Sequence, residues 1–130
     1  MAHRFDIRVY YEDTDLAGIV YYANYLKFIE RARTEWVRSL GIDQTALKQR
    51  DGLVFAVRRV EADYLAAAMF EELLTVETAV LRQSGARIVL RQSVLRSNEC
   101  IFDAEVTLVT LRSDGRPGRF PAALGAALSD

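Results

Sequence analysis

The feature that most constrains this chain is one long amphipathic segment lying between segments patterned as strands. Residues 24–40 repeat apolar side chains at intervals of three and four, the spacing of a single helical face. Asn24 is the expected N-cap and Gly41 the expected C-terminal stop. We expect Arg31 and Glu35 to pair on the solvent side. The apolar positions are Tyr25, Phe28, Ile29, Ala32, Trp36 and Leu40.

Alternating apolar and polar residues predict strands on both sides of this helix. One strand precedes it, and a short helix over residues 43–49, capped by Asp43, follows it. Short polar connections between the later strands predict that the last three form an antiparallel meander. The expected strands are residues 4–11, 53–64, 73–82, 87–95 and 101–112.

A helix with one apolar stripe and a sheet with one apolar face can bury each other. We therefore predict a single α+β domain over residues 1–130, with an antiparallel sheet of about five strands wrapped around one long central helix. One strand carries apolar residues on both faces, Val76 and Val80 on one and Leu73 and Leu81 on the other. A second subunit covering the outer face would explain this pattern, and imperfect patterning is the alternative.

Composition excludes several classes of function. The net charge of −1 disfavours a nucleic-acid partner, which would select a basic surface. The single cysteine, Cys100, fits a reducing compartment and is expected to be an inert thiol. The single histidine, His3, is expected to be a solvated terminal residue. One Cys and one His do not make a common zinc site, so we expect no metal and no cofactor.

No targeting or membrane segment is visible. Residues 1–13 carry charges throughout and lack the apolar run of a signal peptide. The longest uncharged stretch, residues 16–26, is much shorter than the roughly 20 apolar residues that span a bilayer. We expect a cytoplasmic protein without a membrane span.

The densest cluster of reactive side chains is Glu12–Asp15, which precedes Gly18 and the long helix. Two interpretations follow from the residues alone. The carboxylates are either solvated groups at a capped helix entrance, or one of them is catalytic beside the free amides of the helix N-terminus. We expect Asp13 to hydrogen-bond the backbone and fix the loop.

The run YYEDTDLAGIVYYANYLKFIERARTEWVR, residues 10–38, resembles the signature of the hotdog-fold acyl-CoA thioesterases. The likeness is to the YbgC type, with the 4-hydroxybenzoyl-CoA thioesterases more distant. Both the Asp-Thr-Asp step and the helical Phe-x-Glu-x-Ala-Arg pattern are present. The matching residues are Asp13, Thr14, Asp15, Gly18, Val20, Tyr21, Asn24, Tyr25, Phe28, Glu30, Ala32 and Arg33.

The resemblance implies a long helix wrapped by an antiparallel sheet, in dimers with a continuous sheet that often form tetramers. It implies hydrolysis of an acyl-CoA thioester, with Asp15 as nucleophile or general base and the Tyr22 backbone amide as oxyanion donor. We expect Gly18, Val20 and Tyr25 to contact the substrate.

Two positions depart from the pattern. Tyr22 stands where many YbgC-type members have His, and Ala66–Ala68 replaces a Lys-Pro-Ala-like step. The first departure bears on substrate class, because a backbone donor is indifferent to its side chain. Two alternatives remain: a thioesterase acting on acyl carrier protein, and a non-catalytic hotdog dimer that binds acyl groups or a protein. A hotdog dehydratase is disfavoured because it would need a catalytic His.

Overall fold

The structure is a computed structural model that describes residues 2–128, without the side chains of residues 123, 126 and 127. The helices are the 3₁₀ turn η1 (Tyr11–Asp13), α1 (Asn24–Ser39), α2 (Gln44–Asp51) and α3 (Ala122–Leu128). The strands are β1 (His3–Arg8), β2 (Val54–Tyr64), β3 (Leu73–Gln83), β4 (Arg87–Arg96), β5 (Glu99–Leu111) and β6 (Pro117–Gly118).

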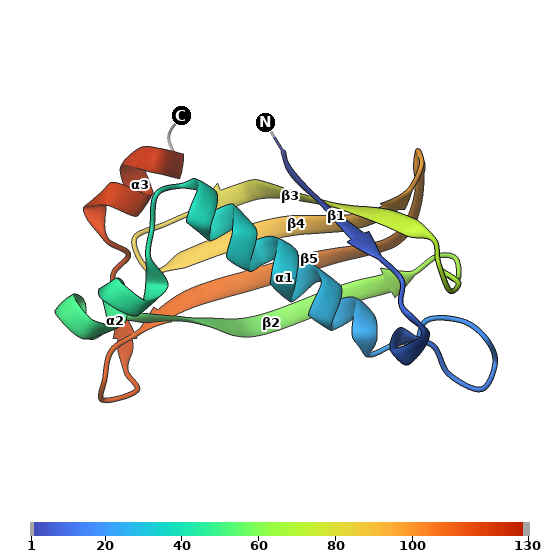
Figure 1. The fold of residues 1–130 in the computed structure, drawn as a ribbon. Coiled ribbons are helices and arrows are strands. Elements are labelled where there is room, and N and C mark those ends of the chain that lie inside the picture. Colours follow the sequence, from blue (N-terminus) through green and yellow to red (C-terminus); the bar gives the residue numbers. More distant parts are fainter. Residues whose placement is uncertain (1, 129–130) are drawn as a thin grey trace.

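The strands form one antiparallel sheet in the order β1-β3-β4-β5-β2, and β6 pairs with the end of β5. Helix α1 lies across one face of this sheet (Figure 1). The predicted α+β architecture and the meander of β3, β4 and β5 are therefore confirmed. The two-residue β6 and the helix α3 were not predicted, because Pro, Gly and Ala there give no strand or helix periodicity.

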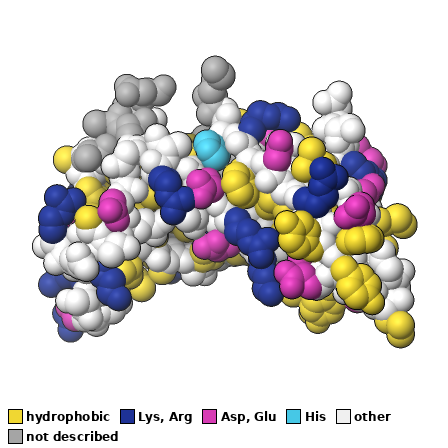
Figure 2. Space-filling view, viewed as in Figure 1, with side chains coloured by type: hydrophobic (Ala, Val, Ile, Leu, Met, Phe, Trp, Pro, Cys, Tyr) yellow, Lys and Arg dark blue, Asp and Glu magenta, His cyan; other side chains and the backbone are white. Residues whose placement is uncertain are grey.

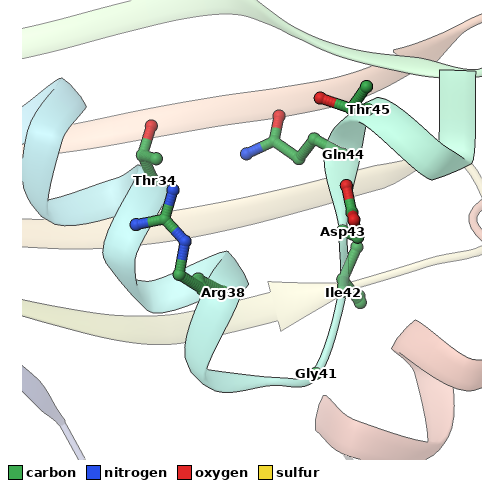
Figure 3. Close-up of a pocket in the computed structure, with 7 residues that line it drawn as sticks. All are labelled: Thr34, Arg38, Gly41, Ile42, Asp43, Gln44 and Thr45. Atoms are coloured by element: carbon green, nitrogen blue, oxygen red, sulfur yellow. The ribbon is translucent and has the colours of Figure 1, made fainter.

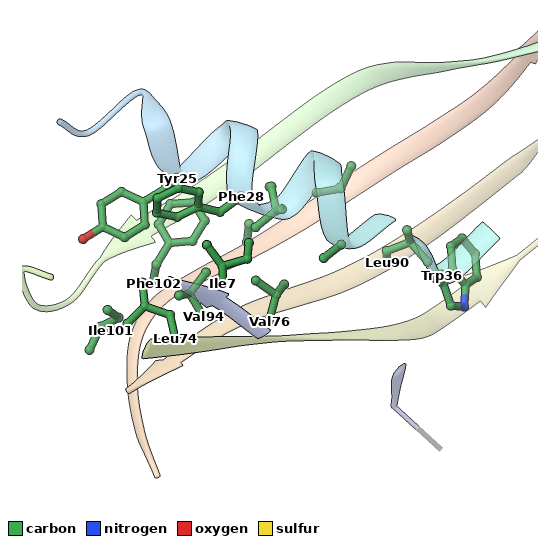
Figure 4. Close-up of a cluster of buried hydrophobic side chains, with 14 of the residues drawn as sticks. Ile7, Tyr25, Phe28, Trp36, Leu74, Val76, Leu90, Val94, Ile101 and Phe102 are labelled. Carbon is green, nitrogen blue, oxygen red and sulfur yellow. The ribbon is translucent and has the colours of Figure 1, made fainter. Parts of the chain in front are cut away.

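The core lies between α1 and the inner face of the sheet (Figure 4). At one end of the helix, the rings of Tyr25 and Phe102 stack with centroids 5.0 Å apart. Burying each large apolar side chain contributes about 1.5–3 kcal/mol, so this face anchors α1 on the sheet. The fully buried large residues include Phe28, Ile29, Leu74, Leu90, Val94, Ile101 and Phe102.

A buried polar group also joins the helix to the sheet. The Gln92 amide on β4 donates to the Ile29 carbonyl at 2.9 Å and to the Thr78 hydroxyl at 3.0 Å. Its oxygen accepts a 2.9 Å hydrogen bond from Arg33, whose pKa is lowered by burial. Sequence patterning missed this network, since one glutamine in a strand has no distinguishing signal. It fixes the position of α1 along the sheet.

Three local expectations were wrong. Ala23, not Asn24, is the N-cap of α1, and it makes no side-chain capping bond. Glu35 pairs with Arg38 rather than Arg31, because residues three apart are also neighbours on a helix. The first strand ends at Arg8, since the chain turns into η1 at Tyr11.

The expectation for His3 was also wrong. It lies in β1 and is half-buried, and its Nδ1 atom has no hydrogen-bond partner among residues 2–128. Cys100 is partly buried, which raises the pKa of its thiol and fits an unreactive group. Within the described residues, no helix is long and apolar enough to cross a membrane, and no cluster of metal-ligating side chains occurs.

Candidate active site

Asp13 is the anchor of the loop that leads into α1. Its side chain is buried, and one carboxylate oxygen accepts a 2.8 Å hydrogen bond from the Tyr10 amide. Its carbonyl accepts from the Tyr21 amide and from the Asn24 side chain, both at 2.9 Å. The expected role of Asp13 in fixing the loop is confirmed. Asn24 serves the same purpose from the first turn of the helix.

Asp15 lies at the exposed tip of this loop, where the chain reverses through Gly18. The Asp15 amide donates to the Ile19 carbonyl, and the Gly18 amide donates to the Asp15 carbonyl, both at 2.9 Å. Gly18 has a φ of +81°, a conformation that L side chains rarely adopt. Only Oδ1 of the carboxylate is engaged within residues 2–128, by the Ala17 amide at 3.0 Å. The second oxygen accepts no hydrogen bond from residues 2–128.

Tyr22 follows the arm of the loop that runs antiparallel to the arm carrying Asp15. Thr14 pairs with Val20, and the Tyr21 amide is already bound to Asp13. The next amide, that of Tyr22, donates no hydrogen bond to any residue in 2–128. No side chain in the described part of the chain caps the N-terminus of α1, so no capping group offsets the partial positive charge of the helix dipole there. The result is a carboxylate and a free backbone donor on one short loop.

The segment between β2 and β3 holds the Asp15 loop and the start of α1 through hydrogen bonds. The Val20 amide donates to the Ala68 carbonyl at 2.9 Å, and the Ala68 amide donates to the Tyr25 hydroxyl at 3.1 Å. Arg96 on β4 donates to the Ala67 carbonyl at 2.7 Å and pairs with Glu72. The Ala66–Ala68 departure thus falls in the segment that holds the loop. Sequence analysis missed Arg96, which carries no motif.

The three expected substrate contacts differ in exposure. Gly18 is exposed at the turn, whereas Val20 and Tyr25 are each only 3% exposed and pack in the core. Burial raises the pKa of the Tyr25 phenol, so it stays protonated. A contact between these side chains and substrate remains a prediction.

Apolar side chains gather on the surface at the end of the molecule that carries the Asp15 loop (Figure 2). Leu16 is fully exposed at the loop tip, and further exposed apolar residues come from η1 and from the segment between β2 and β3. An exposed apolar surface of this kind marks a binding or subunit contact. The exposed residues include Tyr11, Leu16, Leu65, Met69 and Phe70.

Two cavities lie elsewhere. One of about 600 Å³ is at the opposite end of α1, lined by polar groups such as Thr34, Arg38 and Gln44 (Figure 3). The other, about 460 Å³, is an apolar groove between α1 and β2 that includes Leu26, Val57 and Val60. Neither includes Asp15 or Tyr22.

Comparison with known proteins identifies the family of the chain. The profile of the thioesterase superfamily matches residues 17–100, about two thirds of the chain. The chain belongs to the thioesterase superfamily. The acyl-CoA thioesterase YbgC of Haemophilus influenzae is 41% identical over 124 residues, covering 95% of this chain and 91% of that protein. This thioesterase is therefore a thioester hydrolase.

Solved structures agree on the hotdog fold. A probable thioesterase from Bartonella henselae has a TM-score of 0.89 and 37% identity, over 93% of this chain and 100% of that chain. A 4-hydroxybenzoyl-CoA thioesterase bound to 4-hydroxybenzoyl-CoA has a TM-score of 0.92, over 98% of each chain. At 23% identity the latter likeness establishes the fold alone.

Proposed function

We propose that this thioesterase hydrolyses acyl-CoA thioesters to the free acid and coenzyme A. One observation carries the proposal. The Tyr22 amide has no partner within residues 2–128, and it lies on the same short loop as the exposed Asp15 carboxylate. The acyl-CoA substrate is supported by the relatives named as acyl-CoA thioesterases, at 38–41% identity over most of the chain.

In this mechanism the Asp15 carboxylate acts at the thioester carbonyl carbon. It attacks directly, giving a mixed anhydride that water then hydrolyses, or it takes a proton from the attacking water. Either route forms a tetrahedral oxyanion and expels the thiolate of coenzyme A. The Tyr22 amide donates to that oxyanion, and one such donor is worth about 3 kcal/mol in the transition state. Gly18, Val20 and Tyr25 are the proposed contacts to the substrate.

We also propose that the active unit is a dimer built through β2, with a tetramer as a pair of dimers. β2 lies at the edge of the sheet and pairs only with β5 within residues 2–128. Beside it, Val57 and Val60 face the apolar groove at 43% and 39% exposure. A second β2 would complete the sheet and cover the groove. Light scattering on the purified protein measures the mass directly; a monomer at assay concentration contradicts this assembly.

The remaining proposals concern domain organisation and cellular location. One domain over residues 1–130 acting in the cytoplasm fits the single cysteine and the single sheet. Fractionation of cells expressing the tagged protein tests the location.

The test of the activity is thiol release from a panel of short, long and aromatic acyl-CoAs. The Asp15→Asn variant should lose about 10²- to 10⁴-fold in kcat, the range for removing a positioned acid–base group. Asp51→Asn, which removes an exposed carboxylate at the end of α2, is the matched control and should keep wild-type rates. Undiminished turnover by Asp15→Asn contradicts the assigned role. A folded wild type inactive on every acyl-CoA contradicts the substrate class, and an assay on acyl carrier protein thioesters follows.

A further inference from the structure

We propose that Tyr64 is a positioning residue, whose hydroxyl holds the backbone of Tyr22 so that its amide points at the oxyanion. This inference rests on the proposed function, because it assigns a task to the Tyr22 amide. Tyr64 is the last residue of β2, and it lies 42 positions from Tyr22 along the chain. Its phenol donates a 3.2 Å hydrogen bond to the Tyr22 carbonyl oxygen.

The Tyr22 carbonyl is short of helical partners. In a regular α-helix it would accept from the amide four residues on, that of Leu26. Here the Leu26 amide donates to the Ala23 carbonyl at 3.2 Å, and the Tyr25 amide reaches the Tyr22 carbonyl only at 3.4 Å. The Tyr64 hydroxyl therefore supplies a second donor, in addition to the long bond from the Tyr25 amide.

The phenol is itself held in place by a chain of rings. The Tyr64 centroid lies 5.0 Å from that of the fully buried Phe102, its partner across β2 and β5. It is 5.6 Å from Tyr25 and 6.1 Å from Tyr22, both edge to face. Burial raises the pKa of the Tyr64 phenol, so the group remains a donor at neutral pH. The hydroxyl thus has its position set by the sheet.

Two bonds together define the backbone on either side of Tyr22. The peptide that carries the Tyr22 amide also carries the Tyr21 carbonyl, which accepts from the Asn24 amide at 2.8 Å. The following peptide carries the Tyr22 carbonyl, which Tyr64 holds. Within residues 2–128, loss of the phenol hydroxyl leaves the second peptide held only by the 3.4 Å bond from the Tyr25 amide, which gives residue 22 more freedom to rotate. Misalignment of one oxyanion donor loses part of its effect, while the carboxylate of Asp15 is untouched.

The experiment compares Tyr64→Phe with Ser39→Ala on the acyl-CoA that wild type hydrolyses best. Tyr64→Phe keeps every ring contact, and we expect kcat to fall about 5- to 20-fold with KM within about twofold, as for a donor needed in the transition state. Binding of a non-hydrolysable thioether analogue should be unchanged. Ser39→Ala also removes one hydroxyl-to-carbonyl hydrogen bond, the 2.6 Å bond to Trp36 at the opposite end of α1, and should keep wild-type kinetics.

Three further readouts separate positioning from general weakening. The oligomer mass should match wild type. The amide resonance of Ala23, which follows the Tyr22 carbonyl, should shift in Tyr64→Phe and not in Ser39→Ala. Tm measures any loss of stability. A wild-type kcat, a loss confined to KM, or an unmoved Ala23 resonance overturns the proposal.

The Asp15→Asn arm keeps the two proposals apart. If Asp15→Asn loses activity and Tyr64→Phe keeps full activity, only the role of Tyr64 is contradicted. Full activity of Asp15→Asn contradicts the proposed mechanism, and therefore also the role of Tyr64.

Discussion

The two ends of α1 are built differently. At the C-terminal end the backbone and side chains are paired: the Gly41 amide donates to the Arg38 carbonyl at 3.0 Å, and the Ser39 hydroxyl donates to the Trp36 carbonyl at 2.6 Å. At the N-terminal end, within residues 2–128, the Tyr22 amide has no acceptor and the N-cap residue Ala23 has no capping side chain.

The unpaired groups at the N-terminal end of α1 indicate the active site better than the size of a cavity does. The cavity of about 600 Å³ lies at the C-terminal end, but its charged groups have partners: Arg38 pairs with Glu35, and Asp43 accepts from the Ala46 amide. A free donor on the same loop as an exposed carboxylate can stabilise charge that develops in a reaction. We therefore expect paired substitutions at the two ends to cost similar stability and very different activity.

The largest contrast is between Asp13→Ala and Asp43→Ala. Each removes one carboxylate that accepts a backbone N–H, from Tyr10 and from Ala46 respectively. We expect Asp13→Ala to lower kcat about 100-fold, because a misplaced loop disrupts reacting groups at that scale. Asp43→Ala should cost about 1 kcal/mol of stability and no activity. Steady-state kinetics with urea unfolding measures both; equal activities would erase the contrast.

A second contrast pairs Gly18→Ala with Gly41→Ala. Their φ angles are +81° and +82°, and an added Cβ meets no atom within 4 Å at either site. The cost is thus the left-handed backbone alone, about 1–2 kcal/mol. Only Gly18→Ala should reduce kcat, by about 10-fold, since it shifts the turn that carries Asp15. Loss of activity in Gly41→Ala would argue against the assignment.

The third contrast removes one side-chain hydrogen bond at each end. Asn24→Ala frees the Asp13 carbonyl, and Ser39→Ala frees that of Trp36. Each should cost about 1 kcal/mol of stability. Asn24→Ala should also lower kcat by about threefold, corresponding to a fraction of that energy. Thermal unfolding and steady-state kinetics on the same samples measure both effects. A lower kcat for Ser39→Ala than for Asn24→Ala would contradict this prediction.

The smallest expected effect is in the polar cavity. Gln44→Ala and Thr45→Val alter its lining, and surface changes of this kind stay within about 0.5 kcal/mol. Activity should be unchanged for every acyl-CoA tested. A changed substrate preference would show that the C-terminal end takes part in binding.

The sequence predicted the regular elements well because their signal is periodic. The apolar spacing of α1 and the alternation in β3 and β5 follow directly from which face is buried. It predicted the start of α1 but not its cap, because Asn24 has the chemistry of a cap yet bonds to a carbonyl 11 residues earlier. Pairing of that kind depends on how the loop folds back.

The candidate site was predictable in part. Asp15, Gly18 and Tyr22 were drawn from a family resemblance, which names residues but not their neighbours. The contributions of Arg96 and Tyr64 depend on side chains from distant strands meeting one loop. No local pattern signals such a meeting.

The most direct test of the central claim is a crystal structure of Asp15→Asn with a bound acyl-CoA. The account predicts the thioester oxygen about 3 Å from the Tyr22 nitrogen, with residue 15 facing the carbonyl carbon. A thioester bound in the polar cavity at the other end of α1, or with its oxygen away from the Tyr22 amide, would contradict it.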